Sequence, residues 1–129
     1  MSVARVQYVA VVVAVLLLAA ATIGYFLSPG GMLSVVGIDE TPLATFLVRA
    51  LAAAFLAMLP AAWIARRRTG SAIERGVLAG LAIYMFAGSA VDLAAYTGGL
   101  VGPAALPSIA FRVALGATIG WTAFHQSRG

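Results

Sequence analysis

Three ionisable side chains lie inside long apolar segments of the sequence: Arg49, Asp92 and Arg112. A charge held inside such a segment normally faces the interior of a helix bundle and pairs with another charge. From the rise of an α-helix, Arg49 lies about 10 Å into its segment, Asp92 about 6 Å and Arg112 about 8–13 Å, all measured from the same side. We therefore expect a buried Arg–Asp–Arg cluster that joins three helices.

Polar and small residues surround Asp92 at helical spacing. Gly88, Ser89 and Tyr96 share its side of the helix, and Tyr84 lies one turn further down, somewhat rotated away. With Asp92 ionised, the cluster carries one net positive charge, which suits an anionic headgroup or a carboxylate. The predicted ligand-binding residues are Arg49, Asp92, Arg112, Tyr96, Ser89 and Tyr84.

Such a cluster has other interpretations. A buried ion pair often only fixes helix packing, and an intramembrane acid can belong to a proton or ion pathway. The sequence leaves these interpretations open, and no residue is predicted to be catalytic.

The composition requires a membrane around these residues. Of the 129 residues, 63% are hydrophobic and 9% are charged, which leaves too little polar surface to coat a soluble globule. The formal net charge of +4 comes from arginines, most of which lie at segment ends, so it indicates topology and no nucleic acid partner.

The elements that must position the charges are all α-helical. We predict a single transmembrane domain, residues 1–129, with four membrane-spanning helices over about 3–27, 42–65, 72–96 and 105–126. The first helix resembles a signal peptide, but its length favours an uncleaved span. The apolar segment 32–38 is too short to span, so we expect it at the membrane interface, after a break at residues 28–31.

Local motifs mark the helix ends and one helix contact. Thr41 before Pro42 predicts a helix N-cap, and Ser71 with Glu74 predicts a capping box. Gly76-Val-Leu-Ala-Gly80 and Gly116-Ala-Thr-Ile-Gly120 have the small-xxx-small spacing. They favour close approach of the third and fourth spans, and homodimerisation is the alternative.

Arginines predict the orientation, because they concentrate on the cytoplasmic side. Arg5, Arg75, Arg128 and the triplet 66–68 flank the termini and the second loop, whereas the first loop carries Asp39 and Glu40. We therefore expect both termini in the cytoplasm.

Several chemistries are excluded by composition. Lysine and cysteine are absent and His125 is the single histidine, so we expect no Schiff base, no disulfide, no metal site and no cofactor.

The whole pattern resembles the DoxX-like families of small four-helix bacterial membrane proteins. The resemblance is carried by Ser28-Pro29, Gly37-Ile38, Pro42 followed by Arg49, the arginine loop, Asp92 with Gly98, and Arg112. It implies a four-helix bundle in the bacterial inner membrane and adds interest to Arg49, Asp92 and Arg112. Some relatives are subunits of quinone-linked oxidoreductases, but this sequence has no cofactor motif that would carry that role over.

We expect a non-enzymatic module that binds a lipid-like molecule or serves as an accessory membrane subunit. Its expected partners are membrane lipids, an apolar or anionic small molecule, and a membrane protein or second copy. One alternative is a small transporter that couples through Asp92. The other is an intramembrane enzyme in which Asp92 acts with Tyr96 or Tyr84 as acid and base on an apolar substrate.

Overall fold

The computed structural model describes residues 1–125, and this part of the chain is helical with no strand. Its helices are α1 (Val3–Leu27), α2 (Pro29–Val35), α3 (Pro42–Ile64), α4 (Ala72–Thr97) and α5 (Ala105–His125). The all-α prediction is confirmed, and the four long helices occupy the four predicted segments. Gln126, the predicted end of the last segment, and Arg128 lie outside the described residues.

Three of the long helices, α1, α3 and α4, are long and apolar enough to cross a membrane. α5 has sufficient length, with 21 residues, but it is less apolar because Pro107, Ser108 and Arg112 interrupt its first half. The described residues therefore hold three candidate spans by this measure, where the sequence predicted four.

The N-caps predicted for the second and third long helices are confirmed. The Thr41 hydroxyl accepts the Ala44 N–H at 3.1 Å, and the Ser71 hydroxyl accepts the Glu74 N–H at 3.1 Å. The Glu74 carboxylate accepts the N–H of Gly70 at 2.9 Å. Serine and glutamate thus both satisfy backbone donors at the start of α4, as the capping box predicts.

The segment after α1 is helical earlier than expected. We predicted a break over 28–31 before the short interfacial segment 32–38, whereas α2 begins at Pro29 and ends at Val35. The break is confined to Ser28, because proline fits the first position of a new helix. Gly37 then ends the turn with a φ of 79°.

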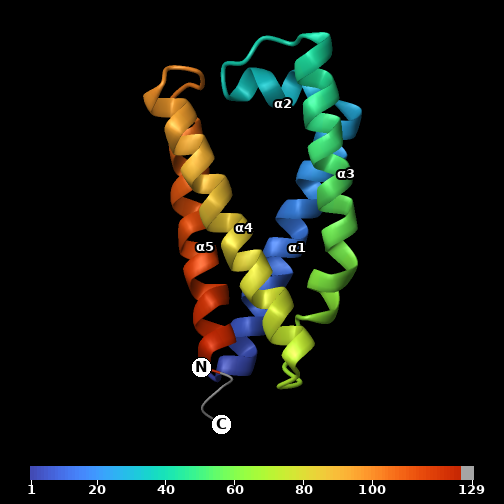
Figure 1. Cartoon of the computed structure of the whole chain (residues 1–129), viewed down its shortest axis with the longest axis vertical. Helices are drawn as coiled ribbons and strands as arrows, with labels where there is room; N and C mark the ends of the chain where they lie inside the picture. The colour runs from blue at the N-terminus through green and yellow to red at the C-terminus, as the bar shows by residue number, and fades with distance from the viewer. Residues whose placement is uncertain (126–129) are drawn as a thin grey trace.

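The long helices form two pairs that diverge. α1 packs along α3, and α4 packs along α5; α1 also contacts α5, and α3 meets α4 only weakly. The pairs converge at the end that holds the N-terminus and the α3–α4 loop, and they splay apart at the end that holds α2 (Figure 1). We name these the arginine end, after Arg5, Arg66, Arg67, Arg68 and Arg75, and the α2 end.

A buried polar contact holds the pairs together at the arginine end. Gln7 of α1 is fully buried and Glu74 of α4 is 5% exposed. The Gln7 amide donates to the Glu74 carboxylate at 2.7 Å and to the Ala65 carbonyl at 2.9 Å. One side chain of α1 therefore ties together the end of α3 and the start of α4.

The glycine motifs contribute unequally to the α4–α5 contact. A Cβ built on Gly116 would lie 2.9 Å from the Met85 Cβ, and one on Gly120 would lie 3.6 Å from the Ala82 Cβ. Gly76 and Gly80 have open space around them. The predicted close approach is right for α5, but its partners on α4 are Ala82 and Met85 in place of Gly76 and Gly80.

Candidate functional site

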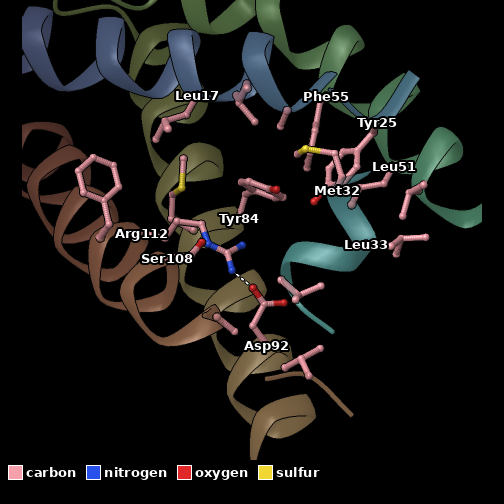
Figure 2. Close-up of a pocket in the computed structure, with 18 of the residues that line it drawn as sticks. Leu17, Tyr25, Met32, Leu33, Leu51, Phe55, Tyr84, Asp92, Ser108 and Arg112 are labelled. Atoms are coloured by element: carbon pink, nitrogen blue, oxygen red, sulfur yellow. Dashed lines mark ion pairs between the residues drawn. The ribbon is translucent and has the colours of Figure 1, made fainter. Parts of the chain in front are cut away.

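A cavity of about 360 Å³ lies between the two helix pairs at the α2 end. All five helices contribute to its wall, and most of the lining side chains are apolar, among them Leu17, Leu33, Leu51, Phe55 and Phe111 (Figure 2). A few polar groups join them: Tyr25, Tyr84, Asp92, Ser108 and Arg112. A mostly apolar cavity with a small number of polar groups is the usual form of a small-molecule site.

The polar side of the cavity is built on the ion pair between Asp92 of α4 and Arg112 of α5. Arg112 is 19% exposed and Asp92 is 41% exposed. The predicted pairing of Asp92 with Arg112 is thus confirmed. The pair links the two helices of one hairpin, so it does not bridge the divergent pairs.

Gly88 makes room for this ion pair. It lies one turn before Asp92 on α4, and a Cβ on Gly88 would approach the Arg112 guanidinium nitrogen to 3.0 Å. The guanidinium therefore lies across α4 where a side chain is missing. Its Nε atom is buried and has no hydrogen-bond partner in the described structure, so Asp92 leaves part of its donor capacity unused.

Tyr84 lies two turns before Asp92 on α4 and adds a hydroxyl to the polar side of the cavity, next to the Arg112 guanidinium (Figure 2). Its ring packs edge-on against Phe55 of α3, with 5.5 Å between the ring centroids. Phe55 in turn contacts Tyr25 of α1 at 6.2 Å. These three rings carry the cavity wall from the α4–α5 pair across to the α1–α3 pair.

Arg49 does not join the predicted cluster. It is exposed on α3 and lines a different hollow, with Glu40, Thr45 and Phe46. The neighbouring residue, Val48, faces the cavity, and one residue turns an α-helix by about 100°. The expected three-residue cluster is therefore reduced to the ion pair of Asp92 and Arg112. With both partners charged, this pair has no net charge, so it no longer favours an anionic ligand.

Two further predicted residues lie beside the cavity without lining it. Ser89 is 4% exposed, and its hydroxyl donates to the Met85 carbonyl of its own helix at 2.7 Å. Tyr96 is half-buried and lies in the last turn of α4, beyond the ion pair. Tyr84, which we expected to be rotated away, lines the cavity instead.

Helix α2 forms part of the cavity wall at the α2 end. Met32 and Leu33 face inward, and Met32 fits against Gly24 of α1, where a Cβ would lie 2.8 Å from its sulfur. At the other end, the Val36 carbonyl accepts the Gly102 N–H of the α4–α5 loop at 2.8 Å. α2 thus packs on α1 and α3 and lies across the space between the two helix pairs (Figure 1), and Val36, which follows it, makes the bond to the other pair.

Some residues that line the cavity or hold the arginine end together were not predicted from the sequence. Phe55 and Met32 resemble any other apolar residue of their segments, and no pattern distinguishes them. Gln7 carries a signal that was overlooked, because an amide in a membrane helix seeks a hydrogen-bond partner in another helix. Glu74 was expected to act only as a cap.

No group of three His, Asp or Glu side chains that could hold a metal ion occurs within residues 1–125. The chain was also compared with known proteins. No family model, no curated protein and no solved structure matches it.

Proposed function

We propose that this protein binds a lipid-like molecule in the cavity at the α2 end and has no enzymatic activity. The observation that carries the proposal is the Asp92–Arg112 pair at the edge of an otherwise apolar cavity. Apolar walls favour a chain or a ring system, and the few polar groups fix the orientation of one end of the ligand.

The charge of the pair indicates which polar end fits. Because Asp92 and Arg112 neutralise each other, a neutral head that exchanges hydrogen bonds suits the site better than an anion. Tyr84 and Ser108 add hydroxyl groups to the same side. A head with carbonyl or hydroxyl oxygens can accept from Arg112 and Tyr84 without leaving a buried charge unpaired.

We also propose that α5 crosses the membrane with the other three long helices, as a hairpin with α4. Arg112 lowers the hydropathy of α5, but its pairing with Asp92 reduces the cost of placing it in the membrane. The N-terminus, the α3–α4 loop and the end of α5 lie together at the arginine end. The arginines there support a cytoplasmic location for both termini.

The resemblance to DoxX-like proteins of the bacterial inner membrane stays a prediction. Four long helices support it. An accessory role beside a larger membrane protein is compatible with the same cavity, and it is an outcome of the experiment below.

The test is native mass spectrometry of protein purified in a mild detergent from the membrane in which it was made. We expect the parent protein to carry a defined small amphipathic molecule. The double variant Asp92→Ala, Arg112→Ala should lose it, and so should Ala21→Phe, which fills the cavity without touching the ion pair. The matched control Asp39→Ala, Arg67→Ala removes one acid and one arginine outside the cavity and should keep the molecule.

Other outcomes would overturn the proposal. A stoichiometric protein partner without a small molecule would make the protein an accessory subunit. Loss of proton-dependent flux in vesicles on Asp92→Asn, in a variant that still folds, would make it a transporter. Conversion of the bound molecule by the parent, but not by Asp92→Asn or Tyr84→Phe, would make it an enzyme.

A further inference from the structure

Arg49 occupies an unusual position for a charged residue. It lies on the outward face of α3, next to Phe46, which is 67% exposed, and Leu47, which is 55% exposed. α3 is a candidate membrane span, so this face meets lipid. From its distance to Pro42, the Arg49 backbone lies about 10 Å below the start of the helix. A long arginine side chain at this depth extends toward the membrane surface to reach polar groups.

Arg49 shares a hollow with the opposite charge of Glu40. Thr41, Pro42, Thr45 and Phe46 complete the lining. Although the two charged residues line one hollow, no ion pair joins them in the described part of the chain. Among the described residues, Glu40 accepts a long bond, at 3.5 Å, from the Thr45 hydroxyl, and its carboxylate lies against Gly30 of α2. The hollow thus presents an anionic and a cationic group that are not paired with each other.

The order of these groups along α3 is informative. Glu40 lies before the first turn, nearest to water; Arg49 lies deeper; and below it the exposed face is apolar, with Ala53 and with Leu56, which is 53% exposed. A phospholipid with an amine headgroup has the complementary order: ammonium outermost, phosphate next, acyl chains innermost. Guanidinium groups are good phosphate ligands, and a carboxylate is a good acceptor for an ammonium.

We propose that the hollow at Glu40 and Arg49 binds the headgroup of a zwitterionic phospholipid with a primary ammonium. Arg49 donates to the phosphate and Glu40 accepts from the ammonium, while the Thr45 hydroxyl donates to Glu40. The acyl chains lie along the exposed apolar face of α3. The assignment depends on α3 spanning the membrane and not on the ligand of the cavity, which lies on the other face of the same helix.

The test measures lipid binding to delipidated protein in detergent by native mass spectrometry. Three lipids with identical acyl chains are compared: phosphatidylethanolamine, phosphatidylcholine and phosphatidylglycerol. The parent should bind phosphatidylethanolamine most tightly. Arg49→Gln should weaken its binding about tenfold, the scale of one charge-assisted hydrogen bond. Glu40→Gln should reduce phosphatidylethanolamine binding to the level of phosphatidylcholine and leave phosphatidylcholine binding unchanged.

Asp39→Asn is the matched control, because Asp39 is the adjacent acid and does not line the hollow. It should leave all three affinities unchanged. Tightest binding of phosphatidylglycerol, with no effect of Glu40→Gln, would overturn the proposal and indicate a simple anion site. Equal affinities in the parent and in Arg49→Gln would also overturn it. A helical circular dichroism spectrum of each variant shows that it is folded.

Discussion

The charged side chains at the two ends of this bundle have opposite surroundings. At the arginine end, the Glu74 carboxylate accepts from the Gln7 amide and from the backbone of the α3–α4 loop, and the helices meet around it. At the α2 end, Arg112 has Asp92 and an unsatisfied Nε, and the helices diverge around a cavity. A carboxylate surrounded by donors holds the helices together, and we call this contact the joint at the arginine end. An ion pair beside a cavity, with one donor nitrogen unused, can still form a hydrogen bond to a ligand.

The largest expected effect tests the joint at the arginine end. Glu74→Ala removes this acceptor from the fully buried Gln7 amide and from the Gly70 N–H of the loop. We expect a loss of about 3 kcal/mol or more in the free energy of unfolding. Equilibrium unfolding in mixed micelles measures it. Glu40→Ala, at an exposed acid of the α2 end, is the control and should cost little. Equal stability of the two variants would break the comparison.

The second prediction tests how closely α4 and α5 pack against each other. Gly116→Ala places a Cβ 2.9 Å from the Met85 Cβ, and overpacking of this kind costs about 1–3 kcal/mol. Gly80→Ala has the same chemistry on α4 but meets nothing within 4 Å, so the monomer should tolerate it. If Gly80→Ala proves the more damaging change, and the parent is a dimer, the exposed glycines belong to a contact between copies.

The third prediction concerns the ion pair itself. In a double-mutant cycle with Asp92→Asn and Arg112→Gln, we expect a coupling free energy of about 1 kcal/mol, because the carboxylate is 41% exposed. The value should be well below the loss caused by Glu74→Ala. A coupling as large as that loss would mean that the α2 end is a second structural joint, with its charges fixed for packing.

The smallest effect on stability is expected for Gly88→Ala. The added Cβ would lie 3.0 Å from the Arg112 guanidinium, which is the mobile end of a long side chain, so we expect a loss of less than about 1 kcal/mol. The ligand of the cavity should nevertheless bind several-fold more weakly, since the guanidinium must shift. Native mass spectrometry measures how much ligand the variant retains. Unchanged retention would mean that Arg112 does not contribute to ligand binding.

The sequence alone determined the helices, their caps and the depth of each charge along its helix. Apolar runs set the segments, and Thr41 and Ser71 begin helices because their hydroxyls satisfy free backbone donors. Depth follows from the rise per residue, so Asp92 and Arg112 were correctly placed at one level. These properties depend on neighbours within a few residues, which is why they can be predicted from the chain.

Only the tertiary structure decided which side chains meet. Val48 and Arg49 differ by one position, and the rotation of α3 against α1 places the first in the cavity wall and the second on the outer surface. Gln7 and Glu74 are 67 residues apart and meet because two helix pairs converge. Rotation about the helix axis and the choice of partner depend on packing between distant segments, which the periodicity of a single helix does not contain.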